Sequence, residues 1–250
     1  MTDVEATVAS LTRNWGGRLV SRRSGEVVVK IGGCLILVSD KNRPSETVTG
    51  SEYPRLKCCH NRECPHSEAV FNIGLEVGDV KAAVSRMRGR GTRVIVPPSS
   101  LTSDLGEVTW AVVSSPCDNI LHSLVNTSKY RGRFLPGFED VSDAESEVAV
   151  TGLTYIDHVT YVCRRGESES ILAWYRDTCG MTRFSLAGET EEAGLEVAGD
   201  AALRLKVGEW VSEWMCRETG VRADTGDTER DFKLVLAEPL ADDSVGHVNK

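Results

Sequence analysis

The chain of 250 residues has 40% hydrophobic and 26% charged residues, a composition typical of globular proteins with one large domain or two small ones. Acidic residues outnumber basic residues by 37 to 29, and the net charge of −8 argues against a nucleic-acid-binding protein, which usually carries clustered positive charge. Residues 1–17 lack the apolar segment of a secretory signal, and no apolar run approaches the roughly 20 residues that span a membrane. The eight cysteines therefore favour reduced thiols over a disulfide framework.

The N-terminal region predicts a helix followed by two strands. Apolar residues recur at helical spacing over residues 4–15, and two glycines follow them. Runs of β-branched and apolar residues then predict strands over residues 26–31 and 34–38. The polar, proline-containing residues 41–51 predict a linker.

The middle of the chain predicts a β-α-β-β-β unit. Asp79 is placed to cap a helix whose apolar residues follow at positions i, i+3, i+4 and i+7. The β-branched strand after this helix is short, because we expect Pro97 and Pro98 to end it. The predicted strands of the unit cover residues 69–77, 92–96, 107–115 and 120–125.

A second unit of the same kind is predicted further along the chain. A strand over residues 153–162 precedes a helix over residues 170–179, which a glycine ends, and a further strand begins at residues 182–184. The polar residues 217–230 predict a loop, and a last strand is expected at residues 232–237.

These units predict an α+β fold built from repeats. Both units place a Thr-Arg-apolar strand one or two residues after the glycine that ends the helix, and the N-terminal helix and strands repeat the pattern without an opening strand. Because each unit buries one face of its sheet, it needs another unit to cover that face. The acidic stretch at residues 138–147 predicts the boundary between a first domain, residues 1–147, and a second, residues 148–240, with a tail at residues 241–250.

The repeated β-α-β-β-β unit resembles the vicinal-oxygen-chelate fold, and three stretches are similar to the 4-hydroxyphenylpyruvate dioxygenase family. The sequence YRGRFLPGF at residues 130–138 resembles the end of that family's first domain. The sequence YIDHV at residues 155–159 resembles its first iron-ligand strand, and residues 174–181 resemble the helix that follows. The resemblance extends over most of residues 4–240 and implies one nearly complete barrel followed by a half barrel.

The resemblance implies a mononuclear non-haem iron(II) site with two histidines and one carboxylate, which leaves open positions for an aromatic 2-oxoacid and dioxygen. In the dioxygenase-like branch of the family, the implied reaction converts 4-hydroxyphenylpyruvate to 4-hydroxymandelate in mitochondria, for the head group of coenzyme Q. A cytoplasmic location is the alternative, and no nucleic-acid partner is expected.

His158 is the metal ligand that the resemblance transfers to this chain. In the predicted strand, Ile156, His158 and Thr160 share one face, so the imidazole faces the cavity if that face lines the barrel. From the residues alone, a lone histidine is more often a packed side chain bonded to the backbone. The resemblance favours the ligand over this alternative.

The family's second histidine and its glutamate lie on a fourth unit, and this sequence holds three units. His247 follows the last predicted strand too closely for the family's spacing, so we interpret it as a tail residue. We therefore expect that these 250 residues, truncated at both ends relative to the family, do not assemble the complete site, and that the exposed half barrel favours self-association. A non-catalytic binding or interaction protein on the same fold is the alternative function.

Two further features bear on the chemistry. The family carries a substrate-contacting asparagine four residues after the first ligand, where this chain has Val162, which cannot make an amide hydrogen bond. The exact substrate is therefore left open. Five metal-capable side chains also cluster within nine residues, but they form a single arm, so a solvated loop with reactive thiols is favoured over a zinc site. They are Cys58, Cys59, His60, Cys64 and His66.

Overall fold

The computed structural model describes residues 3–40, 70–117, 120–142, 151–184, 195–197, 205–207, 210–212, 216–222 and 233–239. The chain divides into two compact units. The first takes its described residues from Met1–Cys64, Ala69–Ser115 and Asn119–Ile156, and the second takes them from Pro116–Asp118 and Asp157–Lys250. The predicted boundary near residue 147 and the linker at residues 41–51 fall outside the described residues, so both stay predictions.

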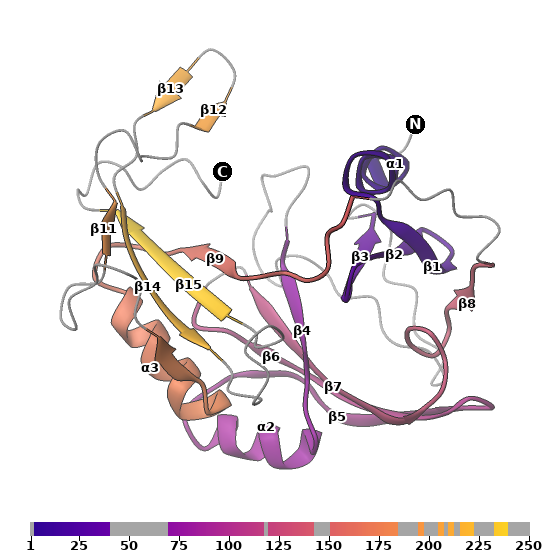
Figure 1. The fold of residues 1–250 in the computed structure, drawn as a ribbon. Coiled ribbons are helices and arrows are strands. Elements are labelled where there is room, and N and C mark those ends of the chain that lie inside the picture. The colour runs from indigo at the N-terminus through magenta and orange to yellow at the C-terminus, as the bar shows by residue number, and fades with distance from the viewer. Residues whose placement is uncertain are drawn as a thin grey trace. The chain divides into compact units, whose positions relative to one another are not determined.

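The first sheet lies in the first unit, and Figure 1 shows it next to helix α1. Its strands run in the order β3-β2-β1-β8, and all of their pairings are antiparallel. Gly16 follows the helix with a φ of 65°, a left-handed conformation that favours glycine. The predicted helix and both predicted strands are confirmed. The elements are α1 (Asp3–Trp15), β1 (Arg18–Arg23), β2 (Glu26–Ile31), β3 (Cys34–Ser39) and β8 (Glu139–Asp140).

The second sheet of this unit confirms the predicted β-α-β-β-β order. The strand order is β4-β7-β6-β5, with β4 parallel to β7 and the other neighbours antiparallel. The carboxylate of Asp79 caps α2 by accepting a hydrogen bond from the backbone N–H of Ala82 at 2.9 Å. The elements are β4 (Asn72–Glu76), α2 (Val80–Arg88), β5 (Val94–Ser103), β6 (Gly106–Ser114) and β7 (Leu121–Tyr130).

The prediction that Pro97 and Pro98 end the strand after α2 is wrong, because β5 continues through them to Ser103. β5 is the edge strand of its sheet, and its register with β6 shifts between Val96 and Ser99. A proline at an edge or in such an irregularity removes no essential ladder hydrogen bond. The position of β5 in the sheet, and not its local sequence, therefore decides where this strand ends.

Both faces of this second sheet are filled. One face packs against α2, which buries Val80, Ala83, Val84 and Met87. A second cluster joins residues of β5, β6 and β7 with the segment that follows β7. Phe134 and Phe138 of that segment meet edge to face with their ring centroids 4.9 Å apart. The buried members of the cluster are Leu101, Val108, Trp110, Val112, Leu121 and Leu135.

The second unit repeats the topology of the second sheet. Its main strands run in the order β10-β14-β15-β9, and β9 is parallel to β15 just as β4 is parallel to β7. The predicted internal repeat is thus confirmed in strand order. The elements are β9 (Val159–Val162), α3 (Ser168–Cys179), β10 (Thr182–Phe184), β14 (Cys216–Arg222), β15 (Lys233–Pro239), and three short strands, β11 (Leu195–Val197), β12 (Leu205–Val207) and β13 (Trp210–Ser212).

Part of the loop predicted at residues 217–230 is a strand, because β14 continues to Arg222. β14 lies between β10 and β15 and pairs with β15 over seven residues. Three partner strands, β10, β11 and β15, supply hydrogen bonds to its backbone, which outweighs its polar composition. Helix α3, drawn beside β14 in Figure 1, packs on this sheet and buries Ile171, Leu172 and Tyr175.

The α+β class is therefore confirmed, whereas the barrels are not. The described strands form separate sheets and close no barrel, so one nearly complete barrel and one half barrel stay predictions. Among the described residues, no helix is both long enough and apolar enough to cross a membrane. The described cysteines Cys34, Cys117, Cys163 and Cys179 are thiols and not disulfides.

Candidate metal-ligand site

The strand predicted at residues 153–162 is shorter than expected, because β9 begins only at Val159. His158 therefore immediately precedes the strand and does not lie in its middle. The preceding residues use their hydrogen bonds elsewhere: the carbonyl of Thr154 accepts from the N–H of Gly33 at 2.6 Å, and the hydroxyl of Thr151 donates to the carbonyl of Trp15 at 3.1 Å. In these residues, hydrogen bonds to other residues of the first unit thus replace the strand pairing that the sequence predicts.

The alternation of side chains along β9 determines the face on which His158 lies. Tyr161 and Cys163 are buried, whereas His158 and Thr160 are exposed. The side chain of His158 is 49% exposed, so its ring reaches solvent. Ile156 is exposed too, but so are all of residues 151–158, which precede the strand, so the shared face of Ile156 and His158 stays a prediction. That this face lines a barrel cavity stays a prediction.

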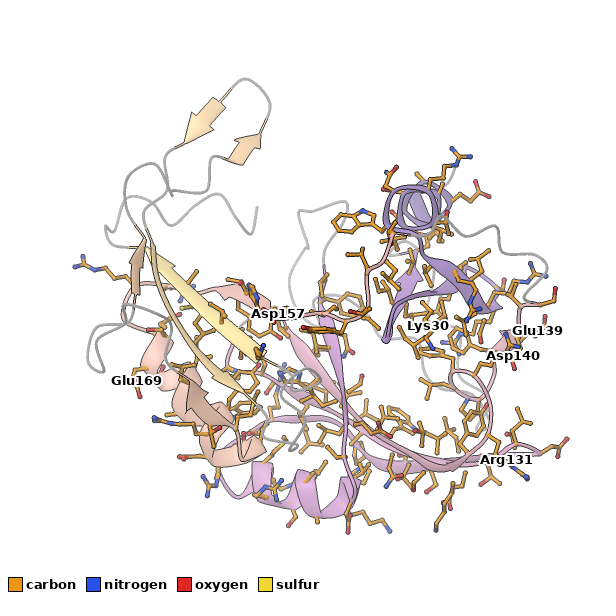
Figure 2. The ribbon with its side chains drawn as sticks, in the orientation of Figure 1. Lys30, Arg131, Glu139, Asp140, Asp157 and Glu169 are labelled. Carbon is orange, nitrogen blue, oxygen red and sulfur yellow. The ribbon has the colours of Figure 1, made fainter. Side chains whose placement is uncertain are left out.

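A carboxylate and a lysine hold the His158 ring. Nδ1 of His158 lies 2.8 Å from one carboxylate oxygen of Asp157, and the ammonium group of Lys233 donates to the other oxygen at 2.8 Å. Figure 2 labels Asp157, which directly precedes His158 in the chain. The parallel register of β9 and β15 pairs Val159 with Leu234, so Lys233 and His158 stand opposite each other one residue earlier. The sheet thus brings together groups 75 or more residues apart in the chain.

The charge of Asp157 is stabilised by these partners. The hydrogen bond from Lys233 lowers the pKa of the Asp157 carboxyl below its ordinary value, and the contact with His158 lowers it further. The Asp157 side chain is 60% exposed, so solvent screens the ion pair and its contribution to stability is about 0–1 kcal/mol. The arrangement therefore orients the imidazole more than it stabilises the fold.

The described residues fit one position of an iron(II) site but do not make up a complete one. A neutral imidazole suits iron(II), and Nε2 of His158 is the nitrogen that Asp157 leaves available. In the part of the chain that the structure describes, no three His, Cys, Asp or Glu side chains form a metal-binding group. Any further ligands would come from other residues. His247 and the cluster at residues 58–66 lie outside the described ranges.

The second described histidine has a different environment. His122 on β7 is fully buried, and its Nδ1 lies 3.1 Å from the backbone carbonyl of Ile73. Burial lowers the pKa of His122 to about 4, so the ring is neutral around pH 7. A buried ring with a backbone partner is part of the core and is not a candidate ligand.

A cavity of about 170 Å³ lies in the first unit, apart from the residues predicted to form the site. Its walls are apolar, and Glu5 and Arg22 are its charged lining residues. None of the residues predicted to bind metal or substrate lines it. Val162, which takes the place of the family's asparagine, ends β9, and its side chain lies outside the described residues.

Sequence reasoning identified His158 but missed the roles of Asp157 and Lys233. Asp157 stood in the quoted YIDHV motif, and a carboxylate beside a candidate ligand is a known orienting partner. Lys233 was detectable only through the repeat. If the first and last strands of a unit are parallel neighbours, the residues that precede them meet.

The comparisons with known proteins first define the fold. The chain superimposes with a TM-score of 0.60 and 16% identity on a triple mutant of 4-hydroxymandelate synthase from Streptomyces coelicolor, over 96% of this chain and 60% of that chain. It also matches a xylose isomerase-like TIM barrel/4-hydroxyphenylpyruvate dioxygenase fusion protein with a TM-score of 0.51 and 15% identity, over 95% of this chain and 30% of that one. The chain therefore shares its fold with proteins of this class.

Curated relatives then confirm the predicted resemblance. The 4-hydroxyphenylpyruvate dioxygenase-like protein of Rattus norvegicus is 31% identical over 196 residues, which cover 76% of this chain and 47% of the relative. The human protein of the same name is 37% identical over 136 residues, or 54% of this chain and 36% of the relative. The 4-hydroxyphenylpyruvate dioxygenase of Yarrowia lipolytica is 33% identical over 52% of this chain and 34% of the relative. The matches span less than half of each of these relatives, and no family model matches the chain.

Proposed function

We propose that this chain belongs to an iron(II)-dependent dioxygenase that acts on an aromatic 2-oxoacid, with His158 as one metal ligand. The reaction we favour is the conversion of 4-hydroxyphenylpyruvate to 4-hydroxymandelate. In that reaction carbon dioxide leaves the oxoacid and both atoms of dioxygen enter the product, so no other oxidant is needed. A role in the synthesis of the coenzyme Q head group and a mitochondrial location are parts of the same proposal.

The observation that carries this proposal is the coincidence of similarity and geometry at His158. The residues YIDHV resemble the family's ligand strand, and relatives named for this dioxygenase are 31–37% identical to the chain. At the same position, the imidazole is exposed and its Nδ1 is held by a carboxylate. A histidine that served only to fill the core would be buried, as His122 is.

Bound iron(II) would supply chelation of the oxoacid and activation of dioxygen. The chain's own contribution, among the described residues, is to present the imidazole of His158 at the start of β9 and to fix its orientation through Asp157. An aliphatic Val162 in place of an asparagine removes a hydrogen bond to substrate, which is compatible with a different product from that of the enzymes that carry the asparagine.

The test is a product assay on the intact protein loaded with iron(II) under nitrogen and then exposed to 4-hydroxyphenylpyruvate and dioxygen. We expect 4-hydroxymandelate in equal amounts to the dioxygen consumed and the carbon dioxide released, and we expect none with His158→Ala. Another aromatic oxidation product would correct the reaction but keep the class. Absence of turnover with every aromatic 2-oxoacid would contradict the proposal.

The second candidate function is a non-catalytic binding or interaction protein on the same fold. The observation that favours it is that the described residues contain no complete group of metal ligands. Self-association belongs to this alternative as well, because Leu153, Tyr155 and Ile156 expose about half of their surface next to His158. Light scattering tests it, and a monodisperse monomer would count against self-association.

A further inference from the structure

We propose that Asp157 and Lys233 are positioning residues that select the tautomer of His158 and so make Nε2 its metal-binding nitrogen. This inference rests on the proposed function for its purpose, but its physical content concerns the protein without metal. Three groups in contact carry it: the Asp157 carboxylate, the His158 ring and the Lys233 ammonium group.

The hydrogen bond between Asp157 and His158 can run in one direction only. An ionised carboxylate only accepts hydrogen bonds, so at 2.8 Å from Asp157 the Nδ1 of His158 must be the donor. In the neutral ring, a proton on Nδ1 leaves the lone pair on Nε2. An imidazole in water favours the opposite tautomer, with its proton on Nε2. Asp157 therefore reverses the intrinsic preference of the ring.

Asp157 is itself held in place. Its side chain is 60% exposed and would otherwise rotate freely in solvent. Lys233 donates to the second carboxylate oxygen, and the lysine side chain is only 25% exposed. Because Lys233 begins β15, which pairs in parallel with β9, the sheet fixes both the donor and the strand that His158 precedes.

His158 is therefore oriented for metal binding before a metal is bound. Metal-binding histidines usually donate their other ring N–H to a carboxylate or carbonyl, and loss of that partner typically weakens metal affinity roughly 10- to 100-fold. The Nδ1 of His122, by comparison, faces the backbone carbonyl of Ile73.

The first experiment measures the tautomer directly, by long-range 1H–15N correlation of the histidine rings in the metal-free intact protein at about pH 8, where an ordinary imidazole is neutral. We expect the Nδ1–H form for His158, a change to mainly Nε2–H in Asp157→Ala, and a mixture in Lys233→Met. Glu169→Gln is the matched control, since it removes an exposed carboxylate that pairs with Arg176 and should leave the tautomer unchanged. An Nε2–H ring in the unaltered protein, or no change in Asp157→Ala, would overturn the inference.

The second experiment titrates the same proteins with cobalt(II) as a metal probe. We expect affinity to fall roughly 10- to 100-fold in Asp157→Ala and by less in Asp157→Asn, whose amide oxygen can still accept from Nδ1. If His158→Ala lowers the affinity for cobalt(II) but Asp157→Ala leaves it unchanged, the inference is also overturned. If the tautomer changes as predicted but His158→Ala binds cobalt(II) as well as the unaltered protein, the positioning holds and the proposed function fails.

Discussion

The second sheet of the first unit and the sheet of the second unit share one topology but use their histidines in opposite ways. In the first, His122 lies on β7, where its ring is fully buried and bonds to a backbone carbonyl. In the second, His158 directly precedes the edge strand β9. Its ring is exposed and bonds to a carboxylate. The same supersecondary unit therefore supplies either core or site, and the neighbours of the imidazole decide which.

The filled face of the first repeat explains part of this difference. The segment after β7 places Leu135, Phe134 and Phe138 on the cluster that Trp110 belongs to. The YRGRFLPGF motif, which carried much of the resemblance, is thus a packing element. Because packed side chains fill that face, it serves the core of the first repeat.

The largest effect we expect comes from removing a buried side chain from this cluster. Leu135→Ala removes a side chain that is 8% exposed and should lower the free energy of unfolding of the first unit by about 2–5 kcal/mol. Leu153→Ala, at a leucine 47% exposed, is the control and should change it by less than about 0.5 kcal/mol. Hydrogen exchange of the β6 amides in urea measures both, and equal effects would show that the segment does not fill the sheet.

The next effect is the pH dependence that His122 imposes. Its pKa of about 4 lies below the ordinary value of 6.5, so the unfolded chain binds the proton more tightly than the folded one. Stability from this group is complete above pH 6.5 and is lost as the pH falls towards 4, by about 1.4 kcal/mol per pH unit. His122→Gln should flatten the slope by that amount in denaturant unfolding between these pH values. A slope that survives the substitution would exclude His122 as its source.

The smallest effect is expected in the second repeat. Lys233→Met should change the free energy of unfolding by less than about 1 kcal/mol, because the Asp157 side of the ion pair is 60% exposed and solvent screens it, while methionine keeps the apolar part of the lysine side chain. The same substitution should still alter the tautomer of His158. Urea unfolding provides the stability value, and a loss of several kcal/mol would mean that the Lys233–Asp157 pair is structural and not orienting.

Local signals in the sequence predicted the elements that local chemistry controls. The Asp79 cap and the glycine at position 180, which ends α3 with a φ of 70°, are of this kind. The strand through Pro97 and the strand at residues 216–222 depend on partners far away in the chain, so local composition misjudged them. The late start of β9 has the same cause, since Thr154 bonds to Gly33.

The residues of the candidate site also divide into those that a local motif predicts and those that depend on distant parts of the chain. His158 was predictable because a motif of consecutive residues carries it. The Lys233–Asp157 contact joins residues 76 positions apart and required the parallel pairing of β9 with β15. The remaining ligands of a complete site could not be assigned from the sequence, and they do not lie among the described residues as a group of three.

The most direct test of the account is the iron content of the intact protein, loaded with iron(II) without oxygen and freed of excess metal by gel filtration. We predict that the iron bound by the unaltered protein is kept in His122→Gln and lost in His158→Ala. Iron retained by His158→Ala would contradict the assignment of His158 as a ligand.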